Sequence, residues 1–159
     1  MKAMVVYDSV HGNTRQVAET VAEALRVAAD VETREVTEVE PGQLTGLDVL
    51  IVGAPTHAFQ PTAAARAFLK RIPPGALRGA RVAAFDTRIS EEDVGSGVFS
   101  FFVKFFGYAA EPIAARLKRK GGDLTLPPEG FFVLESEGPL KAGELERAAN
   151  WARPMVETD

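Results

Sequence analysis

Residues 2–25 read KAMVVYDSVHGNTRQVAETVAEAL and carry two patterns of apolar residues in succession. The first part, residues 2–7, is a nearly continuous apolar run, which is typical of a strand buried on both faces of a parallel sheet. Val17, Val21 and Leu25 then recur at helical spacing, which predicts an amphipathic helix a few residues after the strand. The stretch therefore predicts a strand, a short loop and a helix, the repeating unit of a parallel α/β fold.

The loop between this strand and helix, residues 8–14, is rich in groups that bind anions. The first amide groups of the helix lack intrahelical partners, and the helix dipole favours a negative charge. Ser9, Asn13 and Thr14 add neutral side-chain donors, and Gly12 lets the backbone approach a ligand closely. The loop predicts a phosphate cradle without a lysine, and an ordinary helix cap by Ser9 or Asn13 remains the alternative. Neither the Gly-rich dinucleotide fingerprint nor a Gly-Lys-Ser/Thr phosphate loop is present.

Length and composition indicate one ordinary globular domain that spans residues 1–159. The 159 residues are long enough to bury a single core, and 46% are hydrophobic and 25% charged. The chain has no cysteine, which excludes disulfides, thiolate nucleophiles and Cys-ligated clusters. A net charge of -4 argues against a general nucleic-acid surface. Redox chemistry in this chain therefore requires a bound organic cofactor.

Several further classes of site are not expected. Two histidines, His11 and His57, are too few and too far apart in sequence to predict a metal centre. No apolar stretch approaches the roughly 20 residues that cross a bilayer, and the start of the chain lacks the features of a secretory signal, so a cytoplasmic location is expected. The basic run at residues 116–120 precedes two glycines and is interpreted as a helix end, with a partner-docking patch as the alternative.

Strand and helix patterns alternate along the whole chain. Further strands are expected at residues 31–36, 48–53, 80–86 and 131–135. Further helices are expected at residues 62–72, 98–120 and 142–156. The strand at 31–36 alternates valine with polar residues and is expected at an edge, whereas 48–53 is expected at the centre.

This alternation predicts a three-layer α/β/α sandwich with helices on both faces of an open parallel sheet. Ligands of such folds gather beyond the carboxyl ends of the strands. The loops at residues 8–14, 54–61 and 87–97 follow the first, third and fourth strands, so we expect them to converge. The loop 54–61 contains two prolines, a hydroxyl, an imidazole and an aromatic ring. It could therefore form one wall of a site for a flat ligand.

The chain resembles the flavodoxin family over nearly its whole length. The residues that carry the resemblance are Ser9-Val10-His11-Gly12-Asn13-Thr14, the helix with Val21 and Leu25, Gly53-Ala54-Pro55-Thr56, and Ala83-Ala84-Phe85-Asp86-Thr87. The resemblance implies a doubly wound five-stranded parallel sheet of order 2-1-3-4-5, for which flavodoxin is a standard example. It also implies FMN as the cofactor.

Carried over by position, the resemblance implies two groups of cofactor-binding residues. The phosphate would be held by Ser9, Val10, His11, Gly12, Asn13 and Thr14. The ribityl chain or the ring would be contacted by Pro55, Thr56, His57, Ala58, Phe59, Asp86, Thr87 and Arg88. His11 stands where the family usually has a hydroxyl residue, and neither Trp nor Tyr lies in the ring loops.

Three functions follow from this resemblance. The first is an FMN-binding electron-transfer protein that docks transiently on a redox partner protein. The second is an enzyme similar to the flavodoxin-fold quinone reductases or protoporphyrinogen oxidases, in which His57 or Arg88 would orient the substrate. The third is a flavin-free binding or regulatory module, which His11 and the missing ring-stacking residues would suit.

Overall fold

The computed structural model describes residues 1–57, 59–89 and 108–158. Its strands are β1 (Lys2–Tyr7), β2 (Asp30–Glu35), β3 (Val49–Pro55), β4 (Arg81–Ile89), β5 (Asp123–Leu124) and β6 (Glu129–Val133). Its α-helices are α1 (Asn13–Leu25), α2 (Ala63–Arg71), α5 (Ala110–Arg119) and α6 (Glu144–Ala152). Short 3₁₀ helices are Val36–Glu38, Pro41–Leu44 and Arg153–Val156.

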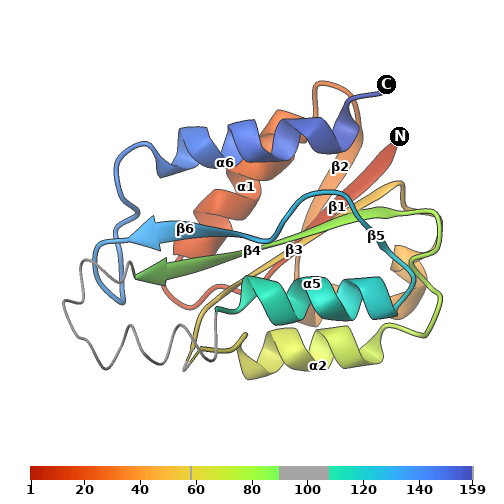
Figure 1. Ribbon diagram of the computed structural model, residues 1–159, viewed down its shortest axis with the longest axis horizontal. Helices are drawn as coiled ribbons and strands as arrows, with labels where there is room; N and C mark the ends of the chain where they lie inside the picture. The colour runs from red at the N-terminus through yellow and green to blue at the C-terminus, as the bar shows by residue number, and fades with distance from the viewer. Residues whose placement is uncertain (58, 90–107, 159) are drawn as a thin grey trace.

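The strands form one parallel sheet in the order β2-β1-β3-β4-β5, with β6 also paired to β4. This arrangement confirms the predicted order 2-1-3-4-5. The sheet runs between two helical layers, with α1 and α6 on one face and α2 and α5 on the other (Figure 1). The predicted three-layer α/β/α sandwich is therefore confirmed, with β2 at an edge and β3 inside the sheet.

The fifth strand position differs from the prediction because two short segments occupy it. β5 pairs with the beginning of β4, at Arg81 and Val82, whereas β6 pairs with its end, from Phe85 to Ile89. Pro127 and Pro128 stand between the two segments. Proline has no amide hydrogen to donate to a ladder, so one continuous strand cannot form there.

The helix expected at residues 98–120 begins at Ala110 in the structure, and residues 98–107 of that prediction lie outside the described residues. Its end agrees with the prediction. The amide of Gly121, at a φ of 103°, donates to the carbonyl of Lys118, and the amide of Gly122 donates to that of Leu117. These bonds close the last turn in the manner of a glycine C-cap, next to three basic side chains.

Two apolar clusters, one on each face of the sheet, explain why the central strands are apolar throughout. Met4 and Val6 of β1 join the cluster under α2 and α5. Ala3, Val5 and Tyr7, which alternate with them, join the cluster under α1 and α6. Successive strand residues point to opposite faces, so a strand covered on both sides needs an apolar residue at every position. Among the described residues, no helix is long and apolar enough to cross a bilayer.

Candidate functional site

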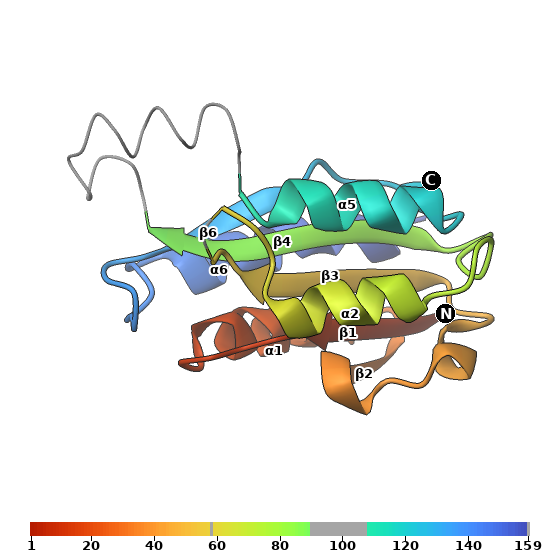
Figure 2. The ribbon, with the colours of Figure 1, turned by 90° about the horizontal axis from the view of Figure 1, so that it is seen from below.

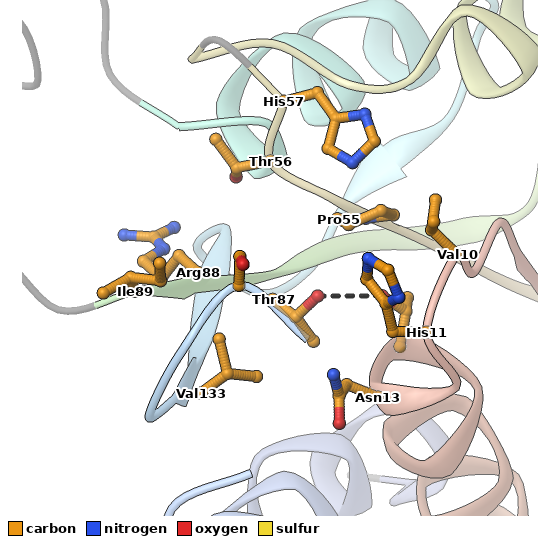
Figure 3. Close-up of a pocket in the computed structure, with 12 residues that line it drawn as sticks. Val10, His11, Asn13, Pro55, Thr56, His57, Thr87, Arg88, Ile89 and Val133 are labelled. Carbon is orange, nitrogen blue, oxygen red and sulfur yellow. Dashed lines mark hydrogen bonds between the residues drawn. The ribbon is translucent and has the colours of Figure 1, made fainter. Parts of the chain in front are cut away.

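A cavity of about 150 Å³ opens at the carboxyl edge of the sheet, where the loops after β1 and β3 meet the last residues of β4 (Figure 3). The convergence expected from the sequence is therefore present for the loops 8–14 and 54–61 and for residues 87–89, whereas residues 90–97 of the third expected loop lie outside the described residues. The loop after β6 supplies a further wall. Nine predicted residues line the cavity: Val10, His11, Asn13, Thr14, Pro55, Thr56, His57, Thr87 and Arg88.

The amino terminus of α1 presents free amide groups beside this cavity. The Ser9 hydroxyl oxygen accepts from the amides of Gly12 at 3.1 Å and Arg15 at 3.3 Å. Within the described residues, no acceptor contacts the amides of Asn13 and Thr14, which lie between them. The N-cap residue is Gly12, and the Ser9 hydroxyl accepts from two amides at the start of the helix, so the first turn still offers two donors to an anion.

Space is available for an anion above this turn. Gly12 has a φ of 90°, in the left-handed region that favours glycine, and a Cβ built on it would meet no heavy atom within 4 Å. The Arg15 side chain turns away and pairs with Glu19 at 2.9 Å on the exposed face of α1. Ser9, Asn13 and Thr14 carry neutral side chains, so an anion here would be held by amide and hydroxyl groups.

Two side-chain contacts hold the first turn of α1 in place. The hydroxyl groups of Thr14 and Thr87 are 2.8 Å apart and buried, which joins α1 to β4. The Asn13 amide nitrogen donates to the carbonyl of Glu137 at 3.1 Å, which joins α1 to the loop after β6. A Cβ added to Gly138 would lie 2.5 Å from Asn13 Oδ1, so this loop packs closely on Asn13. The cradle is therefore fixed from two sides.

The loop after β3 forms a tight turn at the cavity rim. The backbones of His57 and Gln60 exchange two hydrogen bonds, of 2.7 and 2.9 Å. Phe59 within this turn has a φ of 66°, which is uncommon for a bulky residue and costs of the order of 1 kcal/mol or more. Figure 3 shows the imidazoles of His11 and His57 at the cavity, on the loops after β1 and β3 respectively.

Asp86, which is buried, and Arg88, which is partly buried, form an ion pair on β4. Arg88 donates to both carboxylate oxygens of Asp86, at 2.6 and 2.7 Å, and its guanidinium lies 3.6 Å from the centre of the Tyr108 ring. The amide of Ala110, at the start of α5, donates to the same carboxylate at 2.9 Å. Burial raises the pKa of the Asp86 carboxyl, and the bonds from Arg88 and Ala110 oppose this effect.

The contacts of Asp86 and Arg88 stabilise the fold around the end of β4. The Asp86 carboxylate is fully buried, does not line the cavity and ties β4 to α5, so its geometry does not support a contact with the cofactor. Arg88 borders the cavity, but its guanidinium is engaged by Asp86 and Tyr108. Of the two candidate catalytic residues, His57 is the exposed one. Catalytic roles for both stay predictions.

Four more predicted residues lie differently from the nine at the cavity. Ser9 and Gly12 shape the cradle without lining the cavity, Phe59 faces the neighbouring cleft between α2 and α5, and Ala58 lies outside the described residues. Sequence reasoning missed three lining residues: Ile89, Val133 and Ser136. The rule that ligands bind at the carboxyl ends of strands applies equally to the last strand and would have pointed to Val133 and Ser136.

Glu144, in the first turn of α6, fixes the start of that helix against β6. Its carboxylate accepts from the amide of Phe132 at 2.7 Å and from Arg147 at 2.7 and 2.9 Å. Burial tends to raise the pKa of Glu144, but the hydrogen bonds from Arg147 and Phe132 outweigh it and lower the pKa. Because β6 and α6 are joined in this way, the loop between them is held over Asn13.

The fold and the site define a class of protein: a doubly wound α/β domain with an anion cradle at its first helix and a cleft at the switch between β1 and β3. The described residues contain no group of three or more His, Asp or Glu arranged to hold a metal ion.

The family model described as "Flavodoxin domain" matches residues 4–126. The chain therefore belongs to the flavodoxin domain family, as its resemblance predicted.

Solved structures agree with this fold. A flavodoxin from the domain Archaea is 21% identical, with a TM-score of 0.73, over 98% of this chain and 96% of that one. Oxidised flavodoxin 1 from Bacillus cereus is 19% identical, with a TM-score of 0.78, over 98% and 97%. The rubredoxin oxygen:oxidoreductase of Desulfovibrio gigas is 19% identical, with a TM-score of 0.72, over 98% of this chain and 35% of that longer one.

Membership of the flavodoxin domain family gives FMN as the cofactor and electron transfer as the function. The residues of the cavity suit the phosphate end of FMN, because open space, two free amides and neutral hydroxyl and amide side chains meet there. The comparisons do not favour the two other functions that the sequence left open, a quinone reductase or protoporphyrinogen oxidase and a flavin-free module.

Proposed function

We propose that this protein is an FMN-dependent electron carrier that exchanges electrons with partner redox proteins and performs no substrate chemistry of its own. The observation that carries the proposal is the pair of free amides, at Asn13 and Thr14, beside a cavity formed by the loops after β1 and β3 and the end of β4. FMN, when bound, supplies the electron storage that no side chain offers. A cytoplasmic location and a quinone as alternative acceptor stay predictions.

The cavity supports a definite orientation for the cofactor. The amides of Asn13 and Thr14, with the side chains of Ser9, Asn13 and Thr14, would hold the phosphate. At about 150 Å³ the cavity is smaller than the roughly 300 Å³ at which ordinary ligand sites begin, so it encloses one end of FMN only. We therefore place the ribityl chain along Thr87 and Thr56, and the ring at the rim beside Pro55 and His57.

The contacts of the Arg88 guanidinium support the function of an electron carrier over that of an enzyme. An enzyme needs a polar group that is free to position a substrate or move a proton. The Arg88 guanidinium is held by two hydrogen bonds to Asp86, from Nε and Nη2, and lies over the Tyr108 ring, which leaves exposed His57 as the more accessible candidate of the two. His57 at the rim contacts the cofactor or the solvent in this proposal.

A titration of purified protein with FMN, followed by the quenching of flavin fluorescence, tests the cofactor site. Saturable quenching is expected, and Asn13→Ala should raise the dissociation constant for FMN about tenfold because it removes a donor and loosens the loop at Glu137. Asn150→Ala, at an exposed position of α6, is the matched control and should change it less than twofold. A protein that does not bind FMN would leave the flavin-free module as the function to pursue.

A second assay separates the carrier from the enzyme. The FMN-loaded protein, reduced chemically, should pass electrons to a protein acceptor such as cytochrome c. With reduced nicotinamide and a water-soluble quinone it should show no turnover above that of free FMN. Saturable turnover that His57→Ala abolishes would contradict the proposal and identify a reductase.

A further inference from the structure

A second cavity, about 460 Å³ in volume, opens between α2 and α5. These helices lie side by side on one face of the sheet (Figure 2). Part of the lining is apolar: Pro61 and Leu69 are buried beneath it, and Phe59 and Pro112 lie at its sides. The volume is within the range of ordinary binding sites.

The polar lining of this cavity carries positive charge only. Arg66 and Lys70 lie one turn apart on α2, and Arg116 lies on α5. All three are exposed, no carboxylate lines the cavity, and none of the three forms a salt bridge within the described residues. We call this cavity, with its apolar lining and three cations, the basic cleft. A bound anion would relieve the mutual repulsion of its cations.

Positive charge is concentrated on the two helices that form the basic cleft, whereas the rest of the chain is negative. α2 carries three positive and no negative side chains, and α5 carries three positive and one negative. The two helices together therefore have a net charge of +5 in a chain whose net charge is -4, so all other residues together have a net charge of -9. An approaching partner with carboxylates is attracted to this helical face and repelled elsewhere.

The basic cleft also adjoins the cofactor site. The turn from His57 to Gln60 separates the two cavities: His57 lines the cavity at the sheet edge, and Phe59 and Gln60 line the basic cleft. A molecule bound in the cleft would therefore touch the same turn that borders the flavin. For an electron carrier, such a position brings a partner close to the cofactor without covering it.

We propose that the basic cleft docks an acidic segment of a redox partner protein. The carboxylates of that segment contact Arg66, Lys70 and Arg116, and an apolar side chain between them packs on Leu69 and Pro61. This inference rests on the proposed function as an electron carrier. A protein segment fits better than a small anion, because the cations belong to two helices and the lining between them is apolar.

The test uses FMN-loaded protein and a dye-labelled peptide, capped at both ends, in which phenylalanine stands between two runs of three glutamates. Fluorescence anisotropy should show saturable binding that weakens as salt is raised. Replacing the peptide's phenylalanine with serine should weaken binding several-fold, because the apolar lining then has no partner. A peptide with lysines in place of the glutamates should not bind.

Two double variants with equal loss of charge locate the site. Lys70→Gln with Arg116→Gln should raise the dissociation constant of the peptide about tenfold. Lys118→Gln with Arg119→Gln removes two charges from α5 outside the cleft lining and should raise it less than about twofold. Thermal unfolding of both variants, followed by Trp151 fluorescence, checks that they fold like the wild type.

Three results would overturn the proposal: no peptide binding, equal weakening by the two double variants, or competition by inorganic pyrophosphate at concentrations equal to the peptide's. Equal weakening would mean diffuse attraction, and pyrophosphate competition would mean a small-anion site. Peptide binding is measured also without FMN, so that a failure of the cleft is distinguished from a failure of the cofactor site. A protein that binds the peptide but not FMN would overturn the proposed function alone.

Discussion

Thr14 holds the first turn of α1 to β4 and also borders the cofactor cavity. Its hydroxyl and that of Thr87 share one hydrogen bond of 2.8 Å in a buried position. A hydroxyl has one hydrogen to donate, so one of the two threonines keeps a free donor for a ligand. The same pair therefore serves the stability of the fold and the binding of phosphate.

Thr14→Val should affect both properties. Loss of the bond to Thr87 leaves a buried hydroxyl without its partner, so the free energy of unfolding should fall by about 1 to 2 kcal/mol. The dissociation constant for FMN should rise about tenfold, measured by quenching of flavin fluorescence. Thr20→Val, on the same helix but away from the cavity, is the control, and equal effects of the two variants would contradict this role of Thr14.

Arg88 should matter most at neutral pH, because it stabilises the ionised form of Asp86. Burial already raises the pKa of Asp86 in the folded protein, so its contribution to stability is present at low pH and is lost as pH rises. Arg88→Met removes the opposing cation and raises that pKa further. The variant should lose about 3 kcal/mol of unfolding free energy at pH 7 and clearly less at pH 4.5.

Denaturant unfolding at both pH values, followed by Trp151 fluorescence, measures this difference. Arg34→Met is the control, because Arg34 pairs with Glu32 at the surface and its loss should cost under about 0.5 kcal/mol. A cost for Arg88→Met that is the same at pH 7 and pH 4.5 would mean that Asp86 is not the group that Arg88 stabilises.

At the scale of elements, β3 and β4 approach each other so closely that one position of β3 has no room for a side chain. A Cβ on Gly53 would lie 2.1 Å from the ring of Phe85. That ring is fully buried and held edge-on by Phe131 and Trp151, with ring centres 6.0 and 6.1 Å away. The ring has no direction in which to move.

Gly53→Ala should therefore destabilise the protein by about 3 kcal/mol through overpacking. Gly42→Ala, where a Cβ meets nothing within 4 Å, should change the unfolding free energy by less than about 1 kcal/mol. Adding Phe85→Leu to Gly53→Ala should recover part of the loss, measured as coupling in a double-mutant cycle. Strictly additive losses would argue against a direct clash.

The sequence predicted these elements well where one periodicity was strong. β1 and β3 were expected nearly at their observed bounds, and α1 was expected directly after the loop 8–14, because continuous apolar runs and helical spacing leave one interpretation. The division of the fifth strand was missed, although Pro127 and Pro128 signalled it, because β5 is too short to produce a pattern. Side-chain pairings such as Asp86 with Arg88 depend on rotamers and on packing from α5, and no local pattern encodes them.

At the scale of the whole molecule, the cofactor cavity is bordered by loops from across the sheet, so its occupation should stabilise the entire fold. A ligand that binds only the folded state adds about 2.7 kcal/mol at a hundredfold excess over its dissociation constant. For a domain of this length FMN should raise the unfolding temperature by about 5 to 10 °C. Riboflavin, which lacks the phosphate, should raise it by clearly less at the same concentration.

Differential scanning fluorimetry of the ligand-free protein with FMN and with riboflavin measures both shifts. Equal shifts would mean that the amides at Asn13 and Thr14 do not hold the phosphate. No shift with FMN would contradict cofactor binding itself. The unfolding temperature, a property of the whole chain, therefore tests whether FMN binds in this cavity.

The two margins of the sheet also bear on how the protein behaves in a concentrated solution. The edge strand β2 carries charged side chains. The opposite edge consists of two short strands, β5 and β6, with two prolines between them. Aggregation by strand addition needs a long, flat row of free peptide groups. Neither described edge supplies an uncharged, unbroken row of this kind, so the fold is protected against edge-to-edge polymerisation.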